Sequence, residues 1–271
     1  MTGVPARLLV VQHEPDAPVG WLGEWWSELG LDLDVVRGDL GEPIADAWGG
    51  HGEDAGHDGL VVLGGAMGAG DDAVAPWLAA TRGLVADAVA RGVPTLGVCL
   101  GHQLACVALG GRVGRNPAGR TTGLVPVRLT SEGACDPLLA GLDGLVAVHH
   151  NDDVVLDLPP GSTVLATLPD GRPQAVRLGP TAWGVQFHPE TSPEVFGSWL
   201  RWDSPDGLTG EQEQLLASVG AARETLRASW QPLAERFAAL VVDDAAQDAA
   251  DDAAVRSTGR GSAGAASPVT P

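Results

Sequence analysis

The sequence predicts an α/β fold in which a mostly parallel central sheet carries helices on both faces. Over the first two thirds of the chain, short runs of Val and Leu alternate with longer segments of helical periodicity, which is typical of such a sheet. The chain has 271 residues and 44% of them are hydrophobic, so it can fill the core of one or two domains. This composition excludes a wholly disordered chain.

Four strands and two helices account for the N-terminal part of the pattern. The helices are predicted over 21–29 and 76–91, because each is followed by a glycine, Gly30 or Gly92, that can adopt the left-handed conformation of a helix cap. The strands are predicted at 8–12, 31–36, 60–63 and 94–98.

After Gly123 the apolar runs become shorter and strand-like. Turn dipeptides such as Pro160-Gly161 and Asp170-Gly171 separate them, which predicts antiparallel hairpins added to the parallel sheet. These strands are predicted at 124–129, 145–149, 163–167, 174–178 and 183–187.

A helical segment is predicted after the α/β domain. Apolar residues recur every three or four positions over 211–241, which predicts an amphipathic helix or a helix pair. Thr209 and Gln212 match a capping box, and Pro232 is expected to bend or interrupt the helix. We expect the apolar stripe to pack on the domain's own surface, and a partner interface is the alternative.

Three regions follow from this organisation. The α/β domain is assigned to 1–202 and the helical extension to 203–242. The remainder, 243–271, consists mainly of Asp, Ala, Ser and Gly with few large apolar residues, so it is predicted to be disordered.

The charge of the chain excludes some classes of partner. Thirty-five acidic against 16 basic residues give a net charge of −19, so nucleic acid and anionic membrane surfaces are poor partners. The apolar runs are too short to cross a membrane, and no apolar segment of signal-peptide length precedes the first strand. We therefore expect a cytoplasmic protein. Three cysteines are too few for a disulfide framework or a paired zinc site.

The segment Gly97-Val98-Cys99-Leu100-Gly101 lies between a predicted strand and a predicted helix. It matches the tight G-x-nucleophile-x-G turn of hydrolases, with Cys in place of Ser. The flanking glycines are needed because neighbouring backbone crowds the turn. Cys99 would lie at a helix N-terminus, where the dipole favours thiolate over thiol, and the N–H of Leu100 would donate to an oxyanion.

A second motif supplies the proton partner. His188 ends a predicted strand and is followed by Pro189, which breaks strand pairing and lets Glu190 turn back toward the imidazole. Cys99, His188 and Glu190 would then be nucleophile, base and orienting group. Gly64-Gly65, at another strand end, would expose a second oxyanion N–H, and an ordinary glycine turn is the alternative.

Together the two motifs resemble the class I glutamine amidotransferase family, in which a Cys-His-Glu triad removes the side-chain amide of glutamine. They read Gly97-Val-Cys-Leu-Gly-His-Gln103 and Trp183-Gly-Val-Gln-Phe-His-Pro-Glu190, and the resemblance covers 7–202. It implies a flavodoxin-like fold and an amidotransferase domain over 1–202. The residue roles that it implies are nucleophile for Cys99, acid/base for His188, orienter for Glu190, oxyanion donors for Gly65 and Leu100, and glutamine pocket for Gln103.

Two further segments resemble the GMP synthetase-like branch of that family. His150-Asn-Asp-Asp-Val154 is similar to its His-x-Asp-x-Val segment, which implies that His150 and Asp152 bind substrate. Gln174-Ala-Val-Arg177 is similar to its Gln-Ala-Phe-Arg, with Val176 as a departure. Bifunctional GMP synthetases also carry a nucleotide-activating domain with a Ser-Gly-Gly-type loop, and no such loop follows Trp202.

The expected function is therefore hydrolysis of L-glutamine to glutamate and ammonia, with no metal or organic cofactor. The ammonia would be released or passed to a separate synthetase. One alternative is a γ-glutamyl hydrolase acting on γ-glutamyl conjugates, because the same triad serves either leaving group. The alternative from another class is a catalytically silent binding module that regulates a partner.

The remaining candidates have simpler interpretations. Cys106 is interpreted as a buried small hydrophobe, Cys135 as a turn residue, and His102 as a support of the nucleophile turn. His149 and His150 are adjacent in a strand and face opposite ways, so they cannot chelate one metal ion. Solvated loop positions are expected for His13, His51 and His57, and helix packing for Trp21, Trp25 and Trp26.

Overall fold

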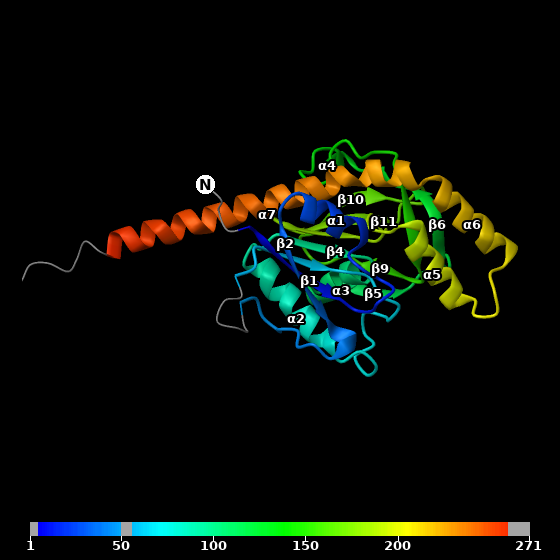
Figure 1. Ribbon diagram of the computed structural model, residues 1–271, viewed down its shortest axis with the longest axis horizontal. Helices are drawn as coiled ribbons and strands as arrows, with labels where there is room; N and C mark the ends of the chain where they lie inside the picture. Colours follow the sequence, from blue (N-terminus) through cyan, green and yellow to red (C-terminus); the bar gives the residue numbers. More distant parts are fainter. Residues whose placement is uncertain (1–4, 50–55, 260–271) are drawn as a thin grey trace, which may run out of the picture.

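A computed structural model of the chain describes residues 5–49 and 56–259, with 247–259 described by their backbone only (Figure 1). Its central sheet has eight strands in the order β2-β1-β3-β4-β12-β11-β10-β7. Their bounds are Asp32–Arg37 for β2, Arg7–Gln12 for β1, Gly59–Val62 for β3, Thr95–Val98 for β4, Ala182–Val185 for β12, Pro173–Gly179 for β11, Thr163–Thr167 for β10 and Arg128–Leu129 for β7.

The sheet is parallel from β2 to β12 and antiparallel from β12 to β7. This confirms the predicted fold class, a mostly parallel sheet extended by antiparallel strands. Two small antiparallel sheets stand beside it, one of β5 (Arg112–Arg115) with β9 (Asp153–Asp157) and one of β6 (Thr121–Pro126) with β8 (Val146–Asn151). The sequence did not indicate β5 or β9.

Helices cover both faces of the central sheet. Helices α2 (Trp77–Ala90) and α3 (Leu100–Ala108) pack on one face, and α1 (Gly20–Glu28) and α7 (Arg223–Gly259) on the other. The three tryptophans of α1 are buried in this core, as predicted. Trp26 packs on Phe237 of α7 with ring centroids 5.7 Å apart and donates Nε1–H to the carbonyl of Ala234 at 3.0 Å.

The shorter helices lie at the ends and edges of the sheet. They are η1 (Gly38–Leu40), α4 (Ser131–Ala134), α5 (Pro193–Asp203) and α6 (Gly210–Ala221). Helix α5 was not among the predicted elements, although it carries residues that line the candidate site. Thr209 and Gln212 form the predicted capping box at the start of α6.

The C-terminal apolar stripe packs on the molecule itself, which confirms the first of its two interpretations. Val219 of α6 and, on α7, Leu226, Trp230, Leu233, Phe237 and Val241 belong to the main hydrophobic core. Pro232 was expected to bend or interrupt the helix; interruption is wrong, because α7 continues through it, and the bend stays a prediction. Burial of Trp230 and Leu233 on either side outweighs the single backbone hydrogen bond that proline removes.

Helix α7 also runs on to Gly259, past Asp243, where disorder was predicted to begin, and its last turns extend beyond the body of the molecule (Figure 1). The predicted disorder of 260–271 lies outside the described residues. Within the described part of the chain, no helix is both long and apolar enough to span a membrane.

Candidate active site

Cys99 occupies a strained turn between β4 and α3. Its φ of 50° is the only positive value among the described residues other than glycine. The turn is held by the N–H of Cys99, which donates to the Val185 carbonyl at 2.8 Å, and by its carbonyl, which accepts from the N–H of Gln103 at 3.0 Å. A Cβ on Gly101 would overlap the carbonyl oxygen of Val62, so the predicted need for glycine beside the cysteine has a steric cause.

The register of the sheet brings His188 to Cys99. Strands β4 and β12 are parallel, with Val98 opposite Val185, so both residues follow the same edge of the sheet. The N–H of His188 donates to the Val148 carbonyl at 2.9 Å, which fixes the backbone there. The His188 side chain lies beside Cys99, since both line the cavity and a Cβ added to Gly64 would contact both side chains, and its Nδ1 lies 2.7 Å from Glu190 Oε1. The structure thus brings together all three predicted triad residues.

The proton on His188 is stabilised by its two partners. Burial by itself lowers the pKa of this imidazole, but the charges of Glu190 and Cys99 and the hydrogen bonds to both outweigh burial and raise the pKa to about 10. The site is therefore organised to hold an imidazolium beside the sulfur at neutral pH.

Glu190 is fixed by the start of α1. The N–H of Trp21 donates to the Glu190 carbonyl at 2.9 Å. Gly20, at φ +56°, is required there, because a Cβ would overlap that same carbonyl oxygen. Thr191 Oγ1 also donates to Glu190 Oε1 at 3.3 Å. The backbone of Glu190 is therefore held by α1, an element far earlier in the sequence.

The predicted oxyanion residues lie together beside the sulfur. A Cβ on Gly65 would be 3.0 Å from Leu100 Cδ2, and one on Gly64 would be 3.7 Å from Cys99 Cβ and 3.2 Å from His188 Cε1. Leu100 is the first residue of α3, where the N–H has no carbonyl of the preceding turn as a partner. The roles of the Gly65 and Leu100 N–H groups as donors stay a prediction.

Two glutamine side chains connect the sulfur to the cavity wall. Gln103 Nε2 donates to the Asp153 carbonyl at 3.0 Å and to Gln186 Oε1 at 3.2 Å, and Gln186 Nε2 lies 3.6 Å from Cys99 Sγ. Gln103 was predicted to line the glutamine pocket, and it lines the cavity. Gln186 was missed, although it stands in the second motif two residues before His188.

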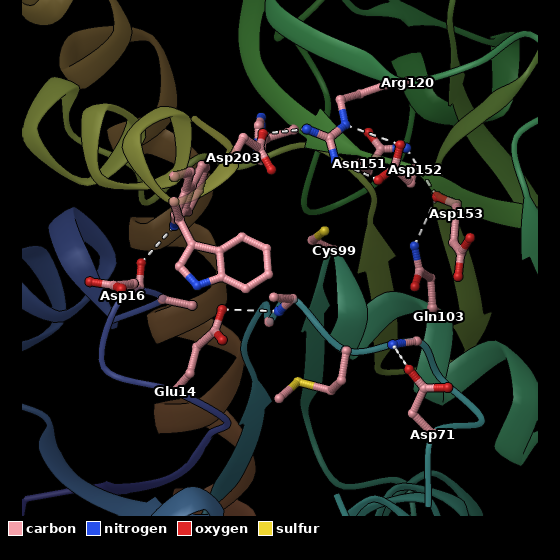
Figure 2. Close-up of a pocket in the computed structure, with 18 of the residues that line it drawn as sticks. Glu14, Asp16, Asp71, Cys99, Gln103, Arg120, Asn151, Asp152, Asp153 and Asp203 are labelled. Atoms are coloured by element: carbon pink, nitrogen blue, oxygen red, sulfur yellow. Dashed lines mark hydrogen bonds and ion pairs between the residues drawn. The ribbon is translucent and has the colours of Figure 1, made fainter. Parts of the chain in front are cut away.

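Cys99 opens into a cavity of about 720 Å³ (Figure 2). On one side Arg120 lies between Asp152 and Asp203 and pairs with both. The hydrogen bond to Arg120 is the main reason why the pKa of Asp152 falls to about 2. Glu14 and Asp71 lie on the opposite side. One wall of the cavity thus carries charges that pair with one another, and the opposite wall carries two carboxylates that accept hydrogen bonds from backbone N–H groups.

His150 lies on the same wall as Asp152. Its Nε2 is 3.1 Å from Asp203 Oδ2 and its Nδ1 is 3.1 Å from Thr122 Oγ1. Burial, only partly offset by the charge of Asp203, lowers the pKa of His150 to about 4, so the ring is neutral at pH 7. The structure places His150 and Asp152 on the cavity, and their binding of substrate stays a prediction.

Most of the remaining histidines and cysteines are packed or paired inside the fold and lie away from the cavity. His102 is buried against Cys106, 3.7 Å from its sulfur, and His149 is buried beside Phe187 while His150 faces the cavity. The side chain of His57 is only 10% exposed and its Nε2 lies 2.9 Å from Asp34 Oδ2, so the prediction that it is solvated is wrong. His51 lies outside the described residues. No cluster of metal-binding side chains occurs in the described part of the chain.

The solvated position predicted for His13 is wrong as well. His13 is fully buried rather than solvated, because the chain leaving β1 runs under Trp77, whose Nε1 donates to His13 Nδ1 at 3.1 Å. Desolvation lowers the pKa of His13 to about 4.

Sequence comparison gives a family match over most of the α/β region. The family model "Glutamine amidotransferase class-I" matches residues 22–201. One subunit of the glutamine-hydrolysing GMP synthase from Sulfolobus acidocaldarius is 38% identical over 117 residues, which are 40% of this chain and 60% of that protein. Anthranilate synthase component 2 from Archaeoglobus fulgidus is 42% identical over 103 residues, 37% of this chain and 53% of that protein. The matches span little more than half of each relative.

Solved structures resemble the whole fold. A glutamine amidotransferase from Thermotoga maritima superposes with a TM-score of 0.74 at 24% identity, over 87% of this chain and 99% of the other. A glutamine amido transferase from Methylobacillus flagellatus gives 0.73 at 23% identity, over 89% of this chain and 96% of the other. At these identities the likeness shows the fold alone.

Proposed function

This chain belongs to the class I glutamine amidotransferase family, and from that membership we propose that it hydrolyses L-glutamine to glutamate and ammonia. The observation that carries the proposal is the arrangement of Cys99, His188 and Glu190, with the sulfur on a positive-φ turn and the imidazole between Cys99 and the Glu190 carboxylate, 2.7 Å from Oε1. No metal or organic cofactor enters the proposed steps, because a thiolate, an imidazolium and an oxyanion site suffice for amide cleavage.

In the first step the Cys99 thiolate attacks the side-chain carboxamide carbon, and a C–S bond forms. The carbonyl oxygen becomes an oxyanion that accepts hydrogen bonds from the N–H groups of Leu100 and Gly65. The His188 imidazolium then gives its proton to the amide nitrogen as the C–N bond breaks. Ammonia leaves, and a γ-glutamyl thioester remains on Cys99.

In the second step water resolves the thioester. His188, now neutral, takes a proton from the attacking water, and a second tetrahedral intermediate forms at the same oxyanion site. The C–S bond breaks, glutamate leaves, and the thiolate and imidazolium are restored. Glu190 keeps the ring oriented through both steps and stabilises its positive charge.

The test is the glutaminase activity of Cys99→Ala. We expect release of ammonia from glutamine to fall by at least about 10³-fold, because no other group supplies the nucleophile. Cys135→Ala, which removes an exposed thiol, is the matched control and should retain activity. Unchanged thermal unfolding of Cys99→Ala would show that the loss is chemical. Turnover retained in Cys99→Ala contradicts the mechanism.

We propose that a separate protein uses the ammonia. The relatives named above are a synthase subunit and a synthase component, which supports a chain that works with a partner. Capture of a synthetase from cell extract, followed by a rise in glutaminase turnover when it is added back, would support this assignment. A captured protein that leaves turnover unchanged would count against it.

A second candidate function is hydrolysis of γ-glutamyl conjugates. The observation that favours it is the size of the cavity, about 720 Å³, which is in the range that accommodates drug-sized ligands and leaves room beyond glutamine. Comparing amine release from γ-glutamyl amines with ammonia release from glutamine separates the two functions. A higher kcat/KM for the conjugates would favour the hydrolase.

A further inference from the structure

A tryptophan without a part in the proposed steps lies against the catalytic imidazole. Trp199, on α5, lines the cavity together with Cys99 and His188. The centroids of its indole and of the His188 ring are 4.5 Å apart, with an angle of 52° between the planes. The face of an indole is negatively polarised and attracts a cation within about 6 Å. Trp199 is thus close enough to act on the charged form of His188.

The indole is held in place from several directions. Its Nε1–H donates to the carbonyl of Asp16 at 2.7 Å. It stacks on His150, with centroids 5.6 Å apart and 22° between the planes, and meets Phe196 edge-on at 6.3 Å. A side chain with these contacts has few rotamers available, so its position beside His188 is fixed before substrate binds.

Among the described residues, four other titratable groups face His188, and none of them does what an aromatic ring beside the imidazolium would do. Cys99 follows β4 and Glu190 lies in the same loop as His188, and both favour its proton. His149 and His150, on β8, disfavour it when charged, but burial is the main cause that lowers their pKa values to about 3 and about 4. Neither ring carries negative charge, so neither competes with the indole as a group that stabilises the imidazolium. The electron-rich ring next to His188 is that of Trp199.

We propose that Trp199 is a positioning residue, which holds the protonated His188 beside Cys99 and limits the access of water to it. Its effect on turnover rests on the proposed function. Its effect on the proton of His188 is a property of the free protein and does not depend on the substrate.

The test compares Trp199→Leu with Trp199→Phe. Both lose the hydrogen bond to Asp16, but only Phe keeps an aromatic face near His188. His188 is titrated by NMR in histidine-labelled protein, with its signals assigned by their loss in His188→Asn. We expect the midpoint in Trp199→Leu to lie about one pH unit below that in Trp199→Phe.

The outcomes are separable. Leu admits more water than Phe, which favours the charged ring, so an equal or higher midpoint in Trp199→Leu overturns the proposal. Trp202→Leu, on the same helix at a side chain that is 71% exposed, is the control and should leave the midpoint unchanged. If Trp199→Leu does not fold, Trp199→Met, also apolar but longer, replaces it.

Glutamine turnover gives a second readout. We expect Trp199→Leu to lower kcat about tenfold with KM changed by less than about threefold, and Trp199→Phe to recover most of the loss. A wild-type protein without glutaminase activity would refute the proposed function, while the titration still decides on Trp199. An active wild type whose two variants titrate alike would refute the role of Trp199 alone.

Discussion

The buried imidazole of His188 keeps its proton because it faces Glu190 and Cys99. His102 is as buried as His188, and desolvation lowers its pKa to about 4. His188 faces Glu190 and Cys99, and its pKa is instead raised to about 10. At neutral pH the buried imidazole of His102 is therefore uncharged, and that of His188 is protonated. The difference comes from a carboxylate placed two residues after one of them.

Replacement of Glu190 by Gln should move the alkaline limit of activity to lower pH. In the folded protein the pKa of His188 is raised from its reference value of 6.5 to about 10. The stabilisation from its charged form is therefore complete below pH 6.5 and is lost as the pH rises through about 10. The imidazolium that protonates the leaving amide nitrogen, and the stability from its ion pair, are therefore lost in the same pH window. Gln keeps the shape of Glu but removes the charge. The pH profile of kcat/KM should fall at a pH at least about one unit lower than in the wild type.

Asp16→Asn is the matched control for this profile. It removes one negative charge from the same cavity, from a residue whose side chain is not among the causes that shift the pKa of His188. Its alkaline limb should coincide with that of the wild type. Identical limbs in Glu190→Gln and the wild type would remove Glu190 from its role.

At the scale of elements, the connection from β4 to α3 depends on the absence of a side chain at Gly101. A Cβ there would overlap the Val62 carbonyl oxygen of β3, which is backbone and cannot rotate away. We expect Gly101→Ala to lower the free energy of unfolding by about 3 kcal/mol, the upper range for overpacked sites, and to displace Cys99. Chemical denaturation and glutaminase turnover measure the two effects.

Gly220→Ala is the companion variant for Gly101→Ala. Gly220 lies in α6 with nothing within 4 Å of a Cβ added there. Alanine favours a helix over glycine by up to about 1 kcal/mol, so this variant should be neutral or slightly more stable. Equal stability of the two variants would show that the overlap at Gly101 is relieved by backbone movement.

Helices and strands could be predicted where a local sequence pattern marks them. They could not be predicted where the element forms only by pairing with a distant segment. The apolar strands β1, β3 and β4 were found because such runs are buried on both faces of a sheet. Strand β5 has the sequence Arg-Val-Gly-Arg, which shows no strand alternation, and it exists through its pairing with β9. Helix α5 did have a signal, because Ser192 caps it and Pro193 occupies its first turn.

The same distinction applies to the site. Cys99, His188 and Glu190 were indicated by motifs, because a tight turn and a proline-broken strand leave marks in the sequence. Trp199 and the contact from Gln186 to the sulfur depend on how α5 and β12 meet the cavity, so spacing alone could not give them. The prediction that His13 is solvated was wrong for a related reason, since its cover, Trp77, comes from a distant helix.

At the scale of the whole molecule, the hydrophobic core crosses the predicted domain boundary at residue 202. Trp26, Leu8 and Val10 of the α/β part share one core cluster with Trp230 and Phe237 of α7. The extension also supports α5, since Arg223 pairs with Glu194 and a Cβ on Gly197 would lie 3.3 Å from Leu216. Helix α5 carries Trp199, which lies against His188, so the extension supports the helix next to the His188 imidazole.

A chain ending at residue 202 should therefore fail to fold cooperatively, although it holds every proposed catalytic residue. Its loss of α6 and α7 would expose Trp26 and the apolar face of β1, and a single buried aromatic already accounts for about 3–5 kcal/mol when truncated. Phe237→Ala in the full chain tests the same contact without deletion, and should lower the free energy of unfolding by that amount. Val242→Ala, at a side chain that is 46% exposed, should change it by less than about 0.5 kcal/mol. A 1–202 chain with a sharp thermal transition and wild-type turnover would show instead that the extension is an independent appendage, and that the sheet can close its own core.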